Sequence, residues 1–239
     1  MSCRPDPAAQ QDASARRATA RSGPHTRISA NRRTLVLVRH GRTAWNASRR
    51  FQGRTDIGLD AAGHEQVQMA AAEVARLGPS AVLTSDASRA HQSAEVLCEL
   101  VGVKAVIDPR LREADIGAWE GLTRDEVKLR FPDEYHAWRN GADVRRGGGE
   151  TYGEVAARAA PAVMELLARL PSGGLLVVVT HGGTAKALLG DLLGLPSAHW
   201  GCVGTLSHGR WSVLEEVSPR WRLEQHNVRP RRPFAAGRT

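Results

Sequence analysis

Five residues of this sequence could carry out phosphoryl transfer together, because each stands at or shortly after the end of an apolar run. They are Arg39, His40, Arg89, Glu113 and His181. In a sheet of parallel strands, the carboxyl ends of the strands meet at one edge, and ligands bind there. We therefore expect two guanidinium groups, two imidazoles and one carboxyl group at that edge. The positive groups repel one another in an empty site, so the cluster predicts a bound anion.

A phosphate ester fits this cluster chemically. The planar forks of Arg39 and Arg89 match phosphate oxygens. A neutral imidazole is a competent nucleophile, and His40 could fix its tautomer by donating to a backbone carbonyl. Glu113 could protonate the leaving alkoxide, provided that burial or an anionic neighbour keeps it protonated near neutrality. Because fixed cations can stabilise the charge, we expect no metal and no other cofactor.

Neutral donors are expected around the same anion. Thr43 and Asn46 lie one short turn after His40. The backbone N–H groups of Gly182 and Gly183 stand at the start of a predicted helix, where the helix dipole favours an anion.

Strands and helices alternate along the chain. Apolar runs predict strands at 34–38, 81–86, 103–108 and 174–183, and helical spacing predicts helices at 59–78, 87–102, 123–140, 147–170 and 184–195. The final third indicates two edge strands. This alternation requires crossover connections, and so predicts an α/β fold with a mostly parallel sheet covered on both faces.

The formal charge of +8 lies at the two ends of the chain. Residues 1–33 hold seven arginines and two aspartates, and residues 228–239 hold four arginines and no acid, so residues 34–227 carry a net charge of −1. We expect one domain over 34–227 between two disordered basic tails. Nucleic-acid binding needs basic and aromatic residues interleaved on a folded face, and Phe234 is the only aromatic in the tails, so we expect no nucleic-acid partner.

The sequence also indicates a cytoplasmic protein without a membrane partner. No apolar run approaches the roughly eighteen residues of a transmembrane helix. The first 33 residues lack the apolar core of a secretory signal, although an Arg- and Ser-rich transit segment stays open. The scattered Cys3, Cys98 and Cys202 make no disulfide framework and no metal-binding pair. The oligomeric state stays open, with a homodimer as one candidate.

Six motifs in order resemble those of the histidine phosphatase superfamily, also called phosphoglycerate-mutase-like. They are "LVRHGRTAWN", "FQGRTDIGLDAAGHEQ", "SDASRAHQSAE", "LREADIGAWEGLT", "GGGE" and "VVTHGG", and they run from about residue 34 to residue 195. The resemblance implies the family's three-layer α/β/α sandwich. It also implies a phosphorylated nucleophile at His40, a phosphate pocket and a proton donor at Glu113. The residues of the implied pocket are Arg39, Arg89 and His181, and the implied substrate contacts include Asn46, Gln52 and Gly53.

Three departures from the mutase pattern favour the phosphatase branch of this superfamily. Ala114 and Asp115 follow the glutamate where the mutases carry arginine and histidine. Only the 33 residues 114–146 separate Glu113 from the "GGGE" segment, and the second histidine is followed by "GGTAK". The stretches "LREADIGAWEGLT", "GLPSAHW" and "RWRLEQHN" are further similar to actinobacterial phosphatases related to glucosyl-3-phosphoglycerate phosphatase. The resemblance implies a metal-independent phosphomonoester hydrolase acting on a small sugar phosphate or phosphoglycerate-type ester.

Other interpretations stay open alongside this one. A cofactor-dependent phosphoglycerate mutase and a non-catalytic module that binds a phospho-ligand or a protein share the same motifs. A metal site at His40 and His181 is disfavoured, because no H-x-x-x-H spacing supports it and arginines repel a cation. Trp45 and Trp119 are expected to line the entrance, and His208 is left outside the predicted site.

Overall fold

One six-stranded sheet runs through the protein, in the order β3-β2-β4-β1-β5-β6. The computed structural model describes residues 31–231, so most of both predicted basic tails lies outside the described residues. The strands are β1 (Thr34–Arg39), β2 (Ala81–Thr84), β3 (Ala105–Ile107), β4 (Leu175–Thr180), β5 (Trp211–Val217) and β6 (Arg220–Val228).

The sheet is mostly parallel, as the alternation of strands and helices predicts. Strands β3, β2, β4 and β1 pair in parallel, β5 pairs antiparallel to β1, and β6 pairs antiparallel to β5. The prediction of two edge strands in the final third is wrong for β5, which lies between β1 and β6. Its residues from Trp211 to Glu215 are buried, because an inner strand has a neighbour on each side.

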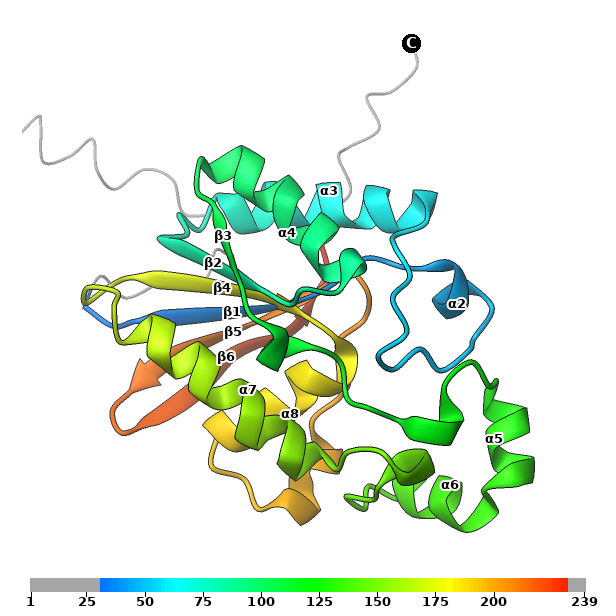
Figure 1. Ribbon diagram of the computed structural model, residues 1–239. Coiled ribbons are helices and arrows are strands. Elements are labelled where there is room, and N and C mark those ends of the chain that lie inside the picture. The colour runs from blue at the N-terminus through cyan, green and yellow to red at the C-terminus, as the bar shows by residue number, and fades with distance from the viewer. Residues whose placement is uncertain (1–30, 232–239) are drawn as a thin grey trace, which may run out of the picture.

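Helices cover both faces of the sheet. They are α2 (Ala44–Ala47), α3 (Ala61–Ala75), α4 (Ser88–Val101), α5 (Arg124–Arg130), α6 (Pro132–Arg139), α7 (Tyr152–Leu167) and α8 (Gly182–Leu192). Figure 1 shows α3 and α4 on one face and α7 and α8 on the other, which confirms the three-layer α/β/α sandwich. The short α2, α5 and α6 lie beyond the carboxyl ends of the parallel strands. Within residues 31–231, no helix has the length and apolar character that crossing a membrane requires.

The alternation of side chains along β1 builds two separate cores. Leu35 and Leu37 pack with residues of α7 and α8, whereas Val36 and Val38 pack with residues of α3 and α4. Successive residues of a strand point to opposite faces, so a central strand covered on both sides is apolar throughout. This burial holds the end of β1, and the polar residues that follow it, in a fixed place.

A third core lies under α5 and α6 and is largely aromatic. Trp119 stands at its centre, fully buried, with Phe51 at 5.3 Å and Trp138 at 5.8 Å between ring centroids. The expectation that Trp119 lines the site entrance is therefore wrong, because its ring is enclosed by other aromatic rings. This core fixes the segment 114–149 at the carboxyl edge of the sheet.

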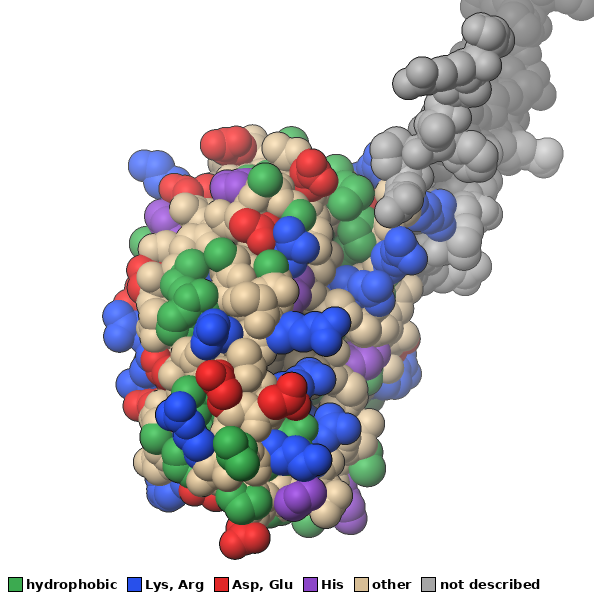
Figure 2. All heavy atoms as spheres, turned by 90° about the vertical axis from the view of Figure 1, so that its right-hand side faces the viewer, with side chains coloured by type: hydrophobic (Ala, Val, Ile, Leu, Met, Phe, Trp, Pro, Cys, Tyr) green, Lys and Arg blue, Asp and Glu red, His purple; other side chains and the backbone are tan. Residues whose placement is uncertain are grey.

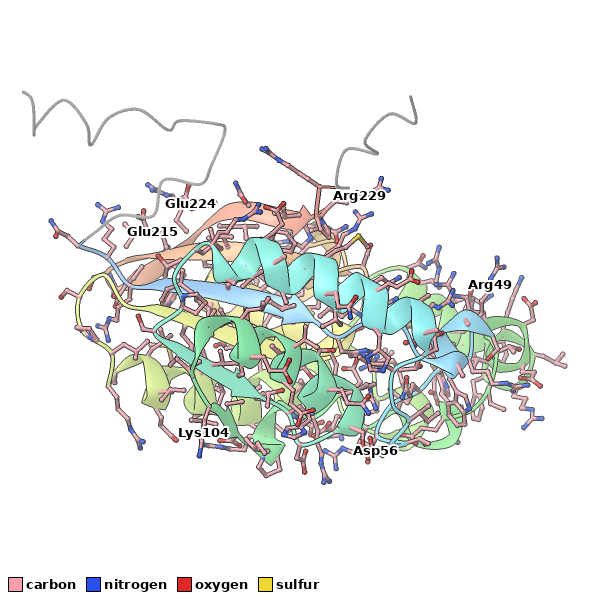
Figure 3. All side chains as sticks on the ribbon, turned by 90° about the horizontal axis from the view of Figure 1, so that it is seen from above. Arg49, Asp56, Lys104, Glu215, Glu224 and Arg229 are labelled. Atoms are coloured by element: carbon pink, nitrogen blue, oxygen red, sulfur yellow. The ribbon has the colours of Figure 1, made fainter. Side chains whose placement is uncertain are left out.

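Contacts with the sheet and with α7 include residues just outside the predicted domain limits of 34 and 227. Arg33 makes a bidentate ion pair with Glu216 and donates to the carbonyl of Leu167. Arg32 forms an ion pair with Glu215. Strand β6 continues to Val228. In Figure 3, Glu215 lies near the point where the described chain begins, beside the β5–β6 hairpin.

Candidate active site

The carboxyl ends of β1 and β4 bring two predicted site segments together. Arg39 lies opposite Thr180 in the β1–β4 pairing, and the N–H group of His40 donates to the carbonyl of Thr180 over 3.0 Å. His181 follows Thr180 directly in the chain. Figure 2 looks onto this edge of the sheet, where basic side chains gather beside a hollow near the middle of the face.

His40 is buried and its tautomer is fixed. Its Nδ1 atom lies 2.6 Å from the carbonyl oxygen of Gly41, which can only accept, so Nδ1 carries the proton and Nε2 keeps a lone pair. Burial lowers the pKa of His40 well below 6.5, and the nearby His181 and Arg89 act in the same direction. The result is a neutral imidazole whose Nε2 can act as a nucleophile.

Gly41 allows the chain to pass close to the start of α3. A Cβ atom on Gly41 would come within 2.4 Å of the carbonyl oxygen of Gly63 and 2.8 Å of the Val67 side chain. A larger residue would displace the loop that holds His40, so close packing explains the glycine that follows the histidine.

His181 faces His40 and lacks hydrogen-bond partners. The two ring centroids are 5.1 Å apart, His181 is fully buried, and neither of its ring nitrogens has a partner among the described residues. Burial lowers the pKa of His181 well below 6.5, with Arg89 and Arg39 acting in the same direction. A buried polar group without a partner is costly, and this one could donate to a bound anion.

Backbone carbonyls hold the two arginines in place. Arg39 donates to the carbonyl of Leu206 over 2.6 Å, and Arg89 donates to the carbonyls of Thr55 and Gly53 over 3.0 and 2.9 Å. The buried Nε atom of each arginine has no partner in the described part of the chain. Burial lowers the pKa of Arg39 to about 10 and also lowers that of Arg89, while Glu113 opposes the shift in both. Since neutral carbonyls position the guanidinium groups, their charge stays available to an anion.

Glu113 sits on the amino-terminal end of α8. Its carboxyl oxygens accept from the N–H groups of Gly183 and Thr184, each over 3.0 Å, and from its own neighbour Ala114 over 2.8 Å. The prediction that the N–H group of Gly183 serves a bound phosphate is therefore wrong in this structure. The free N–H groups of the first helical turn attract the nearest carboxylate, and the N–H of Gly182 is left as the donor for an anion.

A second arginine network holds the segment that carries Glu113. Arg158 of α7 donates to the carbonyls of Arg110, Arg112 and Glu113 over 2.5, 2.9 and 3.2 Å. Glu150 pairs with Arg158 over 2.8 Å and accepts from the backbone N–H of Asp115. The "GGGE" motif thus ties α7 to both sides of Glu113.

Three of the predicted substrate contacts form one hydrogen-bonded group. The hydroxyl of Thr43 donates to Gln52 over 2.9 Å, and Asn46 caps the backbone N–H of Thr43 and approaches Gln52 at 3.5 Å. Gly53 follows, and its carbonyl receives Arg89. These residues link the loop after β1 to the loop 51–58.

Asp56 fixes that loop to the start of α4. Its carboxylate accepts from the N–H and the hydroxyl of Ser88 over 2.8 and 2.6 Å, next to Arg89. Asp56 is labelled in Figure 3, on the loop beside the start of α4.

His208 belongs to the cluster, although the sequence does not predict it there. Its ring centroid lies 5.6 Å from that of His40, and its buried Nε2 atom lacks a partner among residues 31–231. Burial lowers the pKa of His208 to about 3, assisted by Arg39 and Arg42. The position of β5 explains why His208 lies here. An antiparallel strand beside β1 starts where β1 ends, so the loop before β5 reaches the site.

The arrangement concentrates positive charge and hydrogen-bond donors around a neutral nucleophile. The described residues contain no group of three or more histidine, cysteine, aspartate or glutamate side chains that could hold a metal ion. Two arginines and the imidazoles of His181 and His208 surround His40. Such a site can bind a phosphate group and accept its phosphoryl group.

Comparisons with known proteins are consistent across sequence and structure. A model of the histidine phosphatase superfamily (branch 1) matches residues 35–229. The chain is 37% identical over 211 residues to the "Glucosyl-3-phosphoglycerate phosphatase" of Mycobacterium tuberculosis, which covers 82% of this chain and 95% of that protein. It is 41% identical over 167 residues to the "Probable phosphoglycerate mutase GpmB" of Yersinia enterocolitica, which covers 68% of this chain and 75% of that protein.

Comparison with solved structures also finds a mycobacterial glucosyl-3-phosphoglycerate phosphatase. The structure of mycobacterial glucosyl-3-phosphoglycerate phosphatase Rv2419c in complex with VO3 is similar with a TM-score of 0.79 and 38% sequence identity. The similarity covers 82% of this chain and 99% of that chain.

Proposed function

Because the chain belongs to the histidine phosphatase superfamily (branch 1), we propose that it hydrolyses a small phosphate monoester through a phosphohistidine on His40. One observation carries this proposal. The Nδ1 atom of His40 is bonded to the carbonyl of Gly41, so Nε2 is the free nucleophile. It lies among buried nitrogens of Arg39, Arg89 and His181 that have no hydrogen-bond partner within residues 31–231. The matches with relatives confirm the resemblance that the six motifs indicate.

The reaction runs in two steps. In the first, Nε2 of His40 attacks phosphorus, the bond between phosphorus and the ester oxygen breaks, and Glu113 gives its proton to the leaving alkoxide. In the second, water attacks phosphorus, the bond between phosphorus and Nε2 breaks, and Glu113 takes the proton from water. Arg39, Arg89 and His181 stabilise the charge on the phosphoryl oxygens in both steps.

The substrate class follows from the chemistry of the site and from the relatives. The site recognises the phosphate group, and a sequence relative at 37% identity and a solved structure at 38% identity are both named for glucosyl-3-phosphoglycerate. We propose a sugar phosphate or phosphoglycerate-type ester as the substrate. A mutase assay belongs beside the hydrolysis assay, because one relative carries the name of a phosphoglycerate mutase.

The setting of the enzyme is also part of the proposal. Cys98 and Cys202 are free thiols, which supports a reducing, cytoplasmic compartment. The near-neutral charge of residues 34–227 supports a small-molecule partner rather than nucleic acid. A homodimer stays a prediction that light scattering on the purified protein would check.

Trapping the intermediate tests the mechanism. Rapid acid-free quenching with a labelled phosphate ester should yield a phosphoryl adduct that is stable in base and labile in acid, and peptide mapping should place it on His40. We expect His40→Ala to lower kcat by about 10³-fold or more. The exposed His64 offers a matched control, and His64→Ala should keep both the adduct and turnover. Turnover retained in His40→Ala, or an adduct on another residue, would contradict the mechanism.

A further inference from the structure

A second set of buried donors lies next to the phosphate site. Only 6% of the surface of Arg146 is exposed, and its Nε and Nη2 atoms have no partner among the described residues. These two atoms form one edge of the guanidinium group, the fork that binds two oxygens of a carboxylate or phosphate. Arg39, Arg89 and His181 show the same combination of burial and missing partners where the phosphate is expected.

Tyr152 presents a further donor beside this fork. Arg146 lies over its ring, with Cζ 4.5 Å from the ring centroid, and Nη1 donates weakly to the phenol oxygen over 3.5 Å. The Nε1 atom of Trp138 also donates to that oxygen, over 3.3 Å. Because the phenol oxygen already accepts twice, its own proton is left to be donated to a further acceptor.

Lys186 adds a second positive charge at the same ring. Its Nζ atom lies 5.4 Å from the ring centroid of Tyr152, and it stands one turn along α8 from Gly182 and Gly183. Burial lowers the pKa of Lys186, and Arg146 acts in the same direction. Two neighbouring cations with a shared aromatic ring and no anion between them are an unfavourable arrangement.

The carboxylates nearby are already engaged elsewhere. Glu154 pairs with Arg145, and Asp143 accepts from the N–H groups of Tyr152 and Gly153. In the part of the chain that the structure describes, neither Arg146 nor Lys186 forms an ion pair. Among the described residues, both cations are therefore without a neutralising partner, although acidic side chains stand within a few residues of them.

The cluster adjoins the proposed proton donor. A Cβ atom on Gly183 would lie 2.5 Å from Oε1 of Glu113 and 3.5 Å from Cε1 of Tyr152. The side chains of Glu113 and Tyr152 thus both lie against the side of Gly183 where a Cβ atom would stand. The leaving group of the ester must lie near Glu113 to receive its proton, so Tyr152, Arg146 and Lys186 lie on the leaving-group side of the site.

We propose that Arg146, Tyr152 and Lys186 form a subsite for a second anionic group on the leaving-group part of the substrate. The group is a carboxylate or a second phosphate, and the enzyme prefers phosphate esters that carry one over neutral esters of the same size. The proposal rests on the proposed function and deepens it, because it defines the class of ester. Binding of the second anion also supplies the partners that the Arg146 fork lacks.

Matched probes test the subsite. The values of kcat/KM are measured for 3-phosphoglycerate, for glycerol 3-phosphate, which lacks the carboxylate, and for glycerol 1,3-bisphosphate, which replaces it by a phosphate. In Arg146→Met and in Lys186→Met we expect the ratio of an acidic ester to glycerol 3-phosphate to fall about tenfold or more. Arg145→Met is the control, because Arg145 is the exposed neighbour paired with Glu154, and its ratio should stay that of the unsubstituted protein. Whichever acidic ester shows the larger fall identifies the second anion as carboxylate or phosphate.

A binding measurement separates this proposal from the hydrolase proposal. Calorimetric titration of the His40→Ala protein gives the Kd of each probe without turnover, and the melting temperature of every variant reports on folding. Tighter binding of an acidic ester that is lost in His40→Ala/Arg146→Met supports the subsite even if the unsubstituted protein hydrolyses none of the probes. Equal losses on acidic and neutral probes, or unchanged ratios in both Arg146→Met and Arg146→Lys, overturn the subsite and leave the hydrolase proposal in place.

Discussion

At the scale of single residues, the site keeps polar groups free to bind an anion because they are not paired with other side chains. Neutral carbonyls position Arg39 and Arg89 without cancelling their charge, and the ring nitrogens of His181 are buried with no hydrogen-bond partner in the described part of the chain. His40 is the exception, since its Nδ1 atom is bonded and only Nε2 is free. Such a pocket costs free energy when empty, and an anion restores the missing interactions.

The role of Glu113 predicts a dependence on the leaving group. Glu113→Gln cannot donate a proton, so we expect kcat/KM to fall about 100-fold for an alkyl phosphate and much less for p-nitrophenyl phosphate, whose leaving group needs little protonation. Both assays use the same purified variant, so differences in folding cancel. Equal losses on the two substrates would contradict the acid role.

The residues that the sequence predicts are those whose position follows from a strand end. Arg39 ends β1, and His40 and His181 directly follow β1 and β4, so the rule for parallel sheets locates them. The predictions for His208 and Trp119 are wrong because their surroundings depend on tertiary packing. The place of His208 depends on the order of the strands in the sheet, and the place of Trp119 depends on aromatic residues distant in sequence.

At the scale of elements, α7 and α8 position the proton donor from two directions. The first turn of α8 binds the carboxyl oxygens of Glu113, and Arg158 of α7 donates to the backbone carbonyls of Arg110 and Glu113. The motif "GGGE" contributes Glu150, which keeps Arg158 in place. Long-range contacts of this kind have no local signature, so the sequence predicts both helices but not their link to Glu113.

The contacts of Arg158 with the backbone around Glu113 predict an effect of Arg158 on proton donation by Glu113. In Arg158→Met the backbone carbonyls around Glu113 lose their donor, so we expect kcat on an alkyl phosphate to fall about tenfold while KM changes little. If Arg158 positions the acid, p-nitrophenyl phosphate should be affected less, as in Glu113→Gln. The control is Arg169→Met, an exposed arginine just past the end of α7. A uniform loss on both substrates would assign Arg158 to stability alone.

At the scale of the whole molecule, the three imidazoles of the site couple folding to pH. The pKa values of His40, His181 and His208 lie below 6.5 in the folded protein, whereas the unfolded chain binds protons on these groups below about pH 6.5. The unfolded state therefore holds more protons, and the free energy of unfolding falls as the pH is lowered. The carboxylates with lowered pKa values lose their contribution only below about pH 4, so histidines dominate between pH 7 and pH 5.

This coupling gives a prediction that a single substitution tests. Each buried neutral histidine lowers the free energy of unfolding by about 1.4 kcal/mol per pH unit below pH 6.5, and for His208 the window extends down to about pH 3. Urea unfolding at pH 7, 6 and 5 should show this decline, and His208→Asn should reduce its slope by about one proton. The exposed His64 serves as control, and His64→Asn should keep the slope of the unsubstituted protein. Saturating inorganic phosphate should stabilise the folded protein at each pH, because it binds the folded state alone. A slope unchanged by His208→Asn would show that His208 is not held neutral in the folded protein. Greater stability at pH 5 than at pH 7 would show that the three imidazoles together are not held neutral.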